Sequence, residues 1–472
     1  MGEPTVLIRG GEIVTATDMC HADVLVRGDK IEAISIPNGS TADRVIDATG
    51  CYVMPGGIDV HTHLEEPMDW TTRTADDFIT GTVGAAFGGT TTIIDFAKRH
   101  PDCGLYESHE RRMELADGKP VIDYGFHAMV TSAGLTDGGL DDLRRLAHEG
   151  VTSWKFFMAY RDRMMVDDET ILAAMHLAAE LGTLIMVHAE NGAIVADAMQ
   201  RLIDAGRTEE HMHLAAHPHL AEGEAAHRAI ALAELADCPL FIVHVSSRLA
   251  AREVGAARAR GRPVWGETCP QYLVKSYEDY RGLGFEAAKF VCSPPIRERA
   301  NQEYLWEALA TGVLSTIGTD HASFRMKDDL DLPPQKPKGR GYFPRIPNGV
   351  PGIEDRLMVL YEAGVRGGHF GLPRFVDLVS TRPAKLFGLY PRKGAIAPGS
   401  DADIVIWDPN AYHTISADTH HMQVDYNLYE GMVVSGKPRQ VISRGEVIVD
   451  GNTFLGKPGR GQHLVRCGVN GN

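Results

Sequence analysis

Four histidines and one aspartate of this 472-residue chain end apolar runs, where their side chains could bind a metal ion. His61 and His63 end the run Gly-Ile-Asp-Val-His-Thr-His. Because alternate side chains of an extended strand point the same way, both imidazoles face one site. His188, His244 and Asp320 each end a further run, and although the chain has 21 histidines, this repeated placement is hard to explain by chance. Imidazole and carboxylate ligands together predict zinc or a similar divalent ion.

Lys155 lies inside another apolar run, Ser-Trp-Lys-Phe-Phe, where an unpaired ammonium would be costly to bury. One interpretation is an ion pair with Glu190 or Asp320. The other is that CO2 has added to the amine, giving a carbamate with one oxygen for each of two metal ions. Charge counting favours the carbamate, because two divalent cations, the carbamate, Asp320 and a bridging hydroxide leave a net charge of about +1 among neutral histidines.

These residues are spaced along an alternating pattern of strands and helices in the middle of the chain. Eight apolar runs predict strands, at residues 57–61, 91–96, 124–130, 153–158, 184–188, 240–244, 264–268 and 314–319. Helical patterns between them cover residues 76–87, 141–149, 168–181, 223–235 and 248–260, and several begin with an Asp that could cap the helix. The repeats favour a parallel (β/α)8 TIM-like barrel, in which the candidate ligands lie at the C-terminal ends of strands, where barrel enzymes hold their active sites.

Both ends of the chain carry short β patterns separated by Gly and Asn turns. Such runs occupy residues 6–9, 12–15, 23–27, 30–36, 44–47, 402–407, 432–434, 440–443 and 446–449. We therefore expect a small β-sandwich domain from residues 1–54 plus 392–454, a barrel domain over residues 55–391 and a C-terminal tail over residues 455–472. Residues 325–347 predict a long loop, either a lid over the site or, as the sequence slightly favours, a solvated connection.

Composition excludes several classes of function. The formal net charge of -16 disfavours nucleic acid and anionic membranes as partners, since both attract basic patches. No apolar run is long enough to span a membrane, and the N-terminal residues lack a signal-peptide pattern. The seven cysteines are scattered without a CxxC pair, which is typical of reduced thiols and not of disulfides or a thiolate zinc site. We expect a cytoplasmic protein that acts on a small molecule.

Longer motifs carry a resemblance to a known family. They are GGIDVHTHLEEP, GGTTTIIDF, SWKFFMAY, VHAEN, VHVSS, CSPPIR, GTDH, IPNGVPGIEDR and KLFGLYPRKGAIAPGSDADIVIWDP. Together they resemble the dihydropyrimidinase/D-hydantoinase family of cyclic amidohydrolases, and the resemblance covers nearly the whole chain. It implies a barrel with a β-sandwich, a binuclear metal centre that is usually zinc, and commonly a homotetramer. On the family pattern, His61 and His63 bind one ion, His188 and His244 bind the other, carboxylated Lys155 bridges both, and Asp320 ligates the first.

The resemblance also implies a reaction. A water shared by two divalent ions loses a proton near neutral pH, and the hydroxide attacks the amide carbon of a cyclic ureide, giving a ring-opened N-carbamoyl amino acid. Asp320 would carry the proton to the departing ring nitrogen, and the Tyr160 hydroxyl would help to stabilise the oxyanion. Ser293 and Asn348 match positions whose main chain holds the imide edge of the ring. Without the resemblance, Tyr160 would be interpreted as a packing residue, and Ser293 and Asn348 as turn residues.

The loop after His63, residues 64–70, is expected to help set substrate choice, with Leu64 as a substrate contact. Dihydroorotases resemble this region but typically carry Arg where Glu65 stands, to hold a substrate carboxylate. Glu65 therefore argues against an anionic substrate. Residues 160–165 (YRDRMM) are partly polar, and the shape of a pocket there does not follow from the sequence.

Three other interpretations stay open. Another cyclic amidase, such as an allantoinase or a dihydroorotase, would share the metal ligands. A non-catalytic relative, similar to the dihydropyrimidinase-related neuronal proteins, would lack them, whereas all six are present here. A deaminase-type amidohydrolase would bind one metal ion and use Lys155 only in an ion pair.

Overall fold

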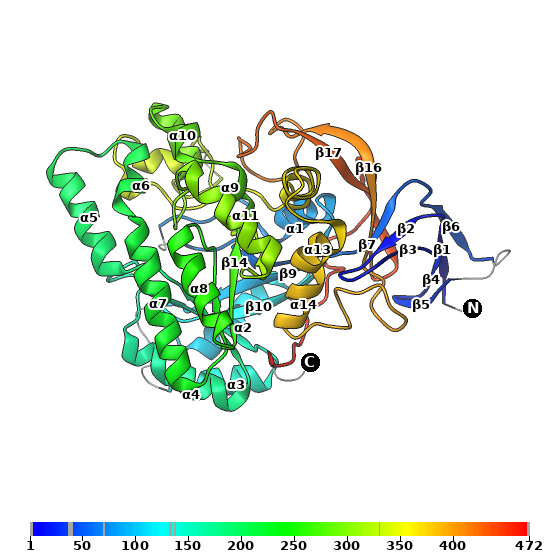
Figure 1. Cartoon of the computed structure of the whole chain (residues 1–472), viewed down its shortest axis with the longest axis horizontal. Coiled ribbons are helices and arrows are strands. Elements are labelled where there is room, and N and C mark those ends of the chain that lie inside the picture. The colour runs from blue at the N-terminus through cyan, green and yellow to red at the C-terminus, as the bar shows by residue number, and fades with distance from the viewer. Residues whose placement is uncertain are drawn as a thin grey trace.

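Eight parallel strands form a nearly closed barrel at the centre of the molecule (Figure 1). The computed structural model describes residues 3–35, 41–68, 71–131, 135, 138–329 and 331–469. The strands pair in chain order: β8 (Gly57–Thr62), β9 (Thr90–Lys98), β10 (Asp123–Met129), β11 (Ser153–Phe157), β12 (Leu184–His188), β13 (Leu240–Ile242), β14 (Val264–Thr268) and β15 (Thr316–Ile317). A parallel bridge between Thr62 and His321 links the first strand to the segment after the last. The predicted (β/α)8 barrel is confirmed.

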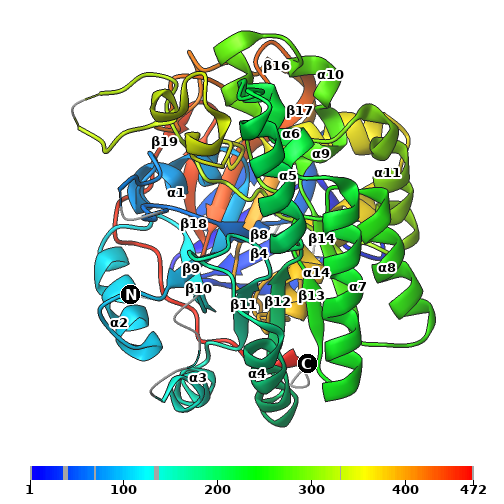
Figure 2. The same ribbon diagram turned by 90° about the vertical axis from the view of Figure 1, so that its left-hand side faces the viewer.

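Helices cover the outside of the barrel (Figure 2). The longer ones are α1 (Phe78–Phe87), α2 (Leu105–Ala116), α3 (Gly139–His148), α4 (Asp168–Leu181), α5 (Gly192–Asp204), α7 (His219–Ala236), α8 (Arg248–Ala259) and α11 (Gln302–Thr311). Shorter ones are α6 (His213–Ala216), α9 (Pro270–Val274), α10 (Tyr277–Tyr280), α12 (Arg356–Leu360), α13 (Leu372–Val376) and α14 (Arg382–Leu386). Asp77 and Asp167 cap α1 and α4 by accepting from backbone N–H groups of the first turn. In the described part of the chain, no helix is long and apolar enough to cross a bilayer.

The barrel strands are apolar throughout because both of their faces are covered. Every residue of β8, β9, β10, β11 and β12 is buried. One face of each strand meets the surrounding helices, and the other meets the barrel interior, where Phe96, Met129, Met186 and Phe241 pack in one cluster. Because apolar side chains fill the interior, a ligand can reach polar side chains only at the ends of the strands.

Strands from both chain ends form two further sheets beside the barrel (Figure 1). The first holds β5 (Lys30–Ile34), β4 (Val24–Arg27), β1 (Thr5–Arg9) and β6 (Arg44–Asp47). The second holds β19 (Thr453–Phe454), β18 (Glu446–Asp450), β17 (Val433–Ser443), β16 (Ile404–Thr414), β7 (Tyr52–Pro55), β2 (Glu12–Val14) and β3 (Met19–His21). Ile8, Val26, Ile404 and Ile442 meet in their shared core. The β-sandwich from both chain ends is confirmed, while the three domain boundaries stay a prediction.

Two details of the predicted sheets are wrong. The runs predicted at 432–434 and 440–443 belong to one strand, β17, whose pairing with β16 shifts register near Pro438, so the alternating pattern is interrupted there. The run predicted at 30–36 ends at Ile34 as β5, and residues 36–40 lie outside the described part of the chain.

Two buried cations, Arg466 and Lys393, connect the N-terminal end of the barrel to other segments of the chain. Residues 455–469 pass across this end, where Arg466 donates to Ser153 Oγ at 2.9 Å. The Lys393 ammonium lies 2.6 Å from Asp123, 3.0 Å from Asp401 and 2.6 Å from Asp403. We call these three carboxylates the aspartate cluster. Asp123 begins β10 and Asp403 precedes β16, so the cluster fastens the barrel to the sandwich.

Candidate active site

A cavity of about 350 Å³ opens at the C-terminal ends of the barrel strands. It is lined by nine of the ten predicted site residues: His61, His63, Lys155, Tyr160, His188, His244, Ser293, Asp320 and Asn348. The tenth, Leu64, lies elsewhere. The folding of separate β–α units into one barrel therefore brings together residues that are more than 280 positions apart in the chain.

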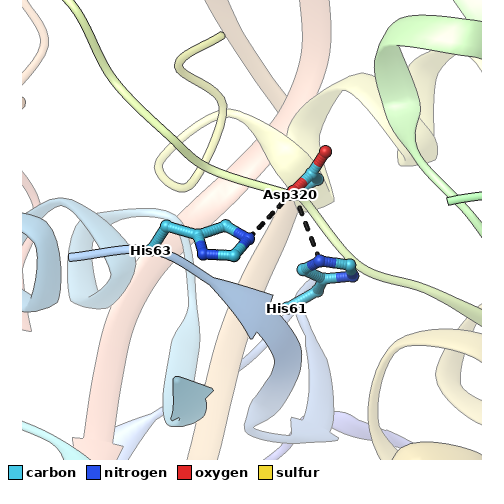
Figure 3. Close-up of side chains that lie close together, drawn as sticks. All are labelled: His61, His63 and Asp320. Carbon is cyan, nitrogen blue, oxygen red and sulfur yellow. Dashed lines mark ion pairs between the residues drawn. The ribbon is translucent and has the colours of Figure 1, made fainter. Parts of the chain in front are cut away.

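His61, His63 and Asp320 form the first group at the base of this cavity (Figure 3). One carboxylate oxygen of Asp320 lies 3.3 Å from His61 Nε2 and 3.2 Å from His63 Nε2. His61 Nε2 is buried and has no hydrogen-bond partner. Ligands about 2.0–2.1 Å from a tetrahedral zinc ion lie roughly 3.3 Å from one another, so the spacing and chemistry of this group fit a zinc-type ion.

Outer carboxylates orient both imidazoles of this group. Glu267 Oε1 lies 2.6 Å from His61 Nδ1, and Glu66 Oε2 lies 2.6 Å from His63 Nδ1. Each contact fixes the ring so that Nε2 faces Asp320, the arrangement that carboxylate partners give to metal-binding histidines. Burial disfavours charge on His63, but Glu66 and Asp320 raise its pKa to about 10, so the position attracts a cation. Burial raises the pKa of Glu267 to about 8, and a nearby metal ion would lower it again.

His188 and His244 form the second group. His188 Nδ1 and His244 Nε2 lie 2.9 Å apart, and burial lowers the pKa of both rings. The other ring nitrogen of His188 lies 3.0 Å from Glu190, whose second oxygen lies 2.9 Å from His217 Nδ1. Two neutral imidazoles with adjacent nitrogens can share one divalent ion.

Lys155 stands between the two groups with its side chain almost fully buried. Its Nζ lies 5.2 Å from the ring centroids of both Phe96 and Phe157. In the described part of the chain, no ion pair joins Lys155 to Glu190 or Asp320. Glu190 pairs with His188 and His217, and Asp320 pairs with His61 and His63. Burial lowers the pKa of Lys155 to about 8, which leaves an appreciable fraction of the amine uncharged near neutral pH.

The predicted substrate contacts lie on the wall above these groups. Asn348 Nδ2 donates to Ser293 Oγ at 3.0 Å, and Ser293 Oγ lies 3.2 Å from His213 Nε2. The ring of Tyr160 is centred 5.1 Å from that of His188. Burial raises the pKa of Tyr160, while its hydrogen bonds with Ser293 and Asn348 lower it, and the hydroxyl stays protonated at neutral pH. These three side chains therefore form one polar patch beside the candidate metal ligands.

Three residues that line this cavity have a strained backbone. Tyr160, His244 and Asp320 have left-handed backbone conformations, with φ of 64°, 39° and 51°. Non-glycine residues adopt this region only where the surrounding structure imposes it, and such positions cluster at functional sites. In each case the unusual turn follows a barrel strand and directs the side chain into the cavity.

The loop after His63 contributes Glu66 and Met68 to the cavity lining, but the expected contact by Leu64 and the argument from Glu65 need correction. Leu64 is fully buried and packs with Phe78, Ala85 and Phe126 beneath α1, so it does not line the cavity. Glu65, at φ 49°, turns its carboxylate away to Lys119, whose Nζ lies 2.9 Å from it. The argument from Glu65 against an anionic substrate therefore loses its basis. Asp69 and Trp70, at the end of this loop, lie outside the described residues.

The segment 325–347, for which a solvated connection was slightly favoured, contributes to the cavity wall. Lys338, Phe343, Arg345 and Ile346 line the cavity. Lys336 anchors the segment, because its fully buried Nζ donates to the carbonyls of Val291, Pro347 and Gly349 at 2.8–3.2 Å. These carbonyls flank Ser293 and Asn348 in the sequence, so the segment supports the substrate-facing wall.

Sequence reasoning missed three of the four residues behind the candidate ligands, and it gave the fourth, Glu190, only as a possible ion-pair partner of Lys155. Glu66, Glu190, His217 and Glu267 are buried and contact ligand rings directly or through one neighbour. Glu267 could have been identified from the sequence, because it follows the apolar run Val-Trp-Gly as the candidate ligands follow theirs. His217 could not, because it lies in an irregular turn after α6 and ends no apolar run.

Comparison with known proteins places this arrangement in a family. The amidohydrolase family profile matches residues 52–448. The D-hydantoinase of Geobacillus stearothermophilus is 50% identical over 464 residues, covering 98% of this chain and 97% of that protein. The dihydropyrimidinase of Rattus norvegicus is 41% identical over 468 residues, covering 98% and 88%. The crystal structure of dihydropyrimidinase from Brevibacillus agri NCHU1002 superposes with a TM-score of 0.95 at 48% identity, covering 98% of this chain and 99% of that one.

The family profile covers most of the chain, and the sequence alignment and the structural superposition cover 98% of it. The residues at the base of the cavity supply the imidazoles and carboxylates that a binuclear amidohydrolase centre requires. The chain therefore belongs to the amidohydrolase family and, within it, to the dihydropyrimidinase/hydantoinase family of cyclic amidohydrolases.

Proposed function

We propose that the protein hydrolyses the cyclic amide bond of dihydropyrimidines and 5-substituted hydantoins to give N-carbamoyl amino acids. One observation carries the proposal: four imidazoles, the Asp320 carboxylate and a buried lysine converge on a single cavity of about 350 Å³. A cavity of this size suits a small cyclic ureide. The names of the relatives, D-hydantoinase and dihydropyrimidinase, point to the same two substrate types.

Two divalent ions, which we expect to be Zn²⁺, would be held by the two ligand groups. His61, His63 and Asp320 offer three ligands to the first ion, whereas His188 and His244 offer only two to the second. Carboxylation of Lys155 would complete both, since CO2 adds to the uncharged amine with release of one proton and leaves a carbamate with two oxygens. The burial of Lys155 and the lack of an ion pair with Glu190 or Asp320 support this modification.

The bound ions would supply a water of low pKa and would polarise the amide carbonyl. Side chains and main-chain groups of the protein would transfer the proton, stabilise the oxyanion and bind the ring. Asp320 accepts the proton of the attacking water and delivers it to the ring nitrogen as the C–N bond breaks. The Tyr160 hydroxyl donates to the carbonyl oxygen as negative charge develops there. The main chain at Ser293 and Asn348 holds the imide edge, because a cyclic ureide presents alternating N–H and C=O groups.

A substrate panel tests this function. Dihydrouracil, hydantoin, 5-substituted hydantoins, allantoin and dihydroorotate would each be incubated with metal-replete protein and assayed for ring opening. We expect turnover of the first three. Turnover of allantoin or dihydroorotate alone would instead identify one of the other cyclic amidases. Metal analysis of the same sample should give about two ions per chain, and one ion per chain would contradict the bridging carbamate.

Two further expectations belong to this proposal. The family resemblance supports a homotetramer, which light scattering or sedimentation would test. The scattered, unpaired cysteines support a cytoplasmic location, with Cys20 and Cys467 exposed as free thiols.

A further inference from the structure

The Tyr160 hydroxyl belongs to a hydrogen-bonded series of polar side chains on the cavity wall. Tyr160, His213, Ser293 and Asn348 all line the cavity. Asn348 Nδ2 donates to Ser293 Oγ at 3.0 Å. His213 Nε2 lies 3.2 Å from the same oxygen and 2.8 Å from the carbonyl oxygen of Cys292. Hydrogen bonds from the Ser293 and Asn348 side chains also lower the pKa of Tyr160. We call His213, Ser293 and Asn348 the polar trio.

The directions of these hydrogen bonds follow from the chemistry of the partners. A carbonyl oxygen only accepts, so His213 Nε2, which contacts the Cys292 carbonyl, carries the ring hydrogen. A ring nitrogen that carries hydrogen cannot accept a hydrogen bond, and neither can an amide nitrogen such as Asn348 Nδ2. The Ser293 hydroxyl therefore cannot donate to either of these two nitrogens. Its hydrogen is left for the Tyr160 oxygen, which agrees with the effect of Ser293 on the pKa of Tyr160.

The Tyr160 oxygen accordingly accepts from two sides. Asn348 has two amide hydrogens, one donated to Ser293 Oγ and the other available to the tyrosine, and the Ser293 hydroxyl is the second donor. The main chain of Tyr160 is fixed as well, because its carbonyl accepts from the backbone of Arg163 at 3.0 Å and of Met164 at 2.9 Å. A phenol oxygen that already accepts twice can form a further hydrogen bond only by donating its own hydrogen. That hydrogen points away from the polar trio and into the cavity.

We infer that His213, Ser293 and Asn348 are positioning residues whose side chains aim the Tyr160 O–H at the substrate carbonyl that is attacked. The inference rests on the proposed function, and this role is separate from the main-chain contacts proposed for Ser293 and Asn348. A donor to an oxyanion is most effective when it is oriented before the charge develops, because no reorganisation is then needed during the reaction. Ser293 and Asn348 act on the hydroxyl directly, and His213 acts by holding Ser293.

A double-mutant cycle between Ser293 and Tyr160 tests the inference. Ser293→Ala removes the hydroxyl and keeps the main chain. We expect kcat for hydantoin to fall by roughly threefold to a hundredfold, the range for directly coupled residues, while KM stays within about threefold. In the Tyr160→Phe background no hydroxyl needs orienting, so the same substitution should change kcat by less than about twofold. Metal analysis of each variant checks that the ligand groups are intact.

His213 provides a second cycle with a conservative variant. The side-chain amide nitrogen of glutamine can take the place of Nε2, so His213→Gln should retain most of the wild-type kcat. His213→Leu loses the donor and should lower kcat, and this loss should disappear in the Tyr160→Phe background. A role limited to packing predicts instead the same loss in both backgrounds.

Ser380→Ala is the matched control for Ser293→Ala. The Ser380 side chain is also buried and donates to a carbonyl, that of Gly56, at 2.6 Å, but it does not line the cavity. This substitution should leave kcat within about twofold of its parent, both in wild type and in Tyr160→Phe.

The possible failures are distinguishable. An unchanged kcat in Ser293→Ala, or an equal loss with and without the Tyr160 hydroxyl, would overturn the inference and leave the proposed function standing. So would an unchanged kcat in Tyr160→Phe. If metal-replete wild-type protein opens neither a hydantoin nor a dihydropyrimidine, the proposed function fails, and the inference fails with it.

Discussion

Among the described residues, two buried clusters each contain three possible metal ligands whose atoms lie within 4.8 Å of one another. The two clusters lie at opposite ends of the barrel. At the N-terminal end, the aspartate cluster surrounds the Lys393 ammonium, with contacts of 2.6, 3.0 and 2.6 Å. At the C-terminal end, His61, His63 and Asp320 face a cavity, and the nearby Lys155 pairs with neither Asp320 nor Glu190.

The difference lies in whether the chain supplies its own cation. Lys393 lies among the three aspartates and, together with Lys30, Arg392 and Arg444, offsets their charge. The aspartates in turn raise the pKa of Lys393 despite its burial. Lys155 forms no such ion pair with any residue that the structure describes, and burial lowers its pKa to about 8. A cluster whose charge the chain offsets internally is structural. A cluster that leaves a buried ligand atom such as His61 Nε2 without a hydrogen bond can accept an external ion. The four variants that follow, ordered by their expected effect on activity, and a pH dependence of stability probe this contrast.

Asp320→Ala should abolish turnover, with kcat at least about 10⁴-fold lower, because the variant would lose the proposed proton carrier, which is also a proposed metal ligand. Asp320→Asn keeps the shape and should lose nearly as much. Steady-state kinetics on hydantoin measure both variants. An active Asp320→Asn enzyme would show that another group carries the proton.

Lys155→Ala should lose bound metal together with activity, because the second ion would keep only His188 and His244. Short carboxylic acids added to the variant should restore part of both, since they can occupy the space of the carbamate. Metal analysis and kinetics measure the outcome. The matched control is Lys393→Met, which also removes a buried lysine but should retain its metal. Full activity of Lys155→Ala would contradict the role of the carbamate.

Tyr160→Phe should lower kcat by roughly 10–1000-fold, the scale for losing one donor to a developing oxyanion, with metal content unchanged. Tyr280→Phe is the control, because the Tyr280 hydroxyl is also buried but donates to the Ile296 carbonyl, outside the cavity, at 2.9 Å. An unchanged rate in Tyr160→Phe would make this tyrosine a packing residue.

Lys393→Met should have the smallest effect on activity and a large one on stability. Removing the cation leaves three buried aspartates partly uncompensated, and breaking a buried ion pair in this way costs about 3–5 kcal/mol. We expect a lower free energy of unfolding in urea but a kcat/KM for hydantoin within about threefold of wild type at a temperature where the variant is folded. A large loss of bound metal in the folded variant would break the distinction between the two clusters.

The stability difference between wild type and Lys393→Met should depend on pH. Burial opposes the charge of Lys393, but the aspartates raise its pKa, so this stabilisation is complete below about pH 10.4 and is lost as the pH rises through the higher folded value. Burial also opposes the charge of Asp401, but Lys393 lowers its pKa, so this stabilisation is complete above about pH 3.9 and is lost as the pH falls through the lower folded value. Urea unfolding across this range measures both limits.

The fold and the gathering of the candidate ligands around one cavity were predictable from sequence because both follow from local patterns. Continuous apolar runs predicted the barrel strands. Each candidate ligand except Lys155 could be located by the run that it ends, and Lys155 by its place inside one. The contacts behind the ligands could not be predicted, because they join distant segments: His61 and Glu267 lie 206 positions apart. The directions of Leu64 and Glu65 also escaped prediction, since the positive φ at Glu65 turns the loop out of strand alternation. The segment 325–347 has no periodic pattern, so only the tertiary contacts of Lys336 reveal its place in the wall.

The left-handed backbone at Tyr160, His244 and Asp320 has a consequence for engineering. An L-residue in this conformation costs about 1–2 kcal/mol that glycine would not incur. Glycine at any of these three positions would relax the main chain and remove a side chain that we propose binds metal or takes part in turnover. A selection for thermal stability alone would therefore tend to enrich stable but inactive variants. Directed evolution of this enzyme needs an activity screen in every round.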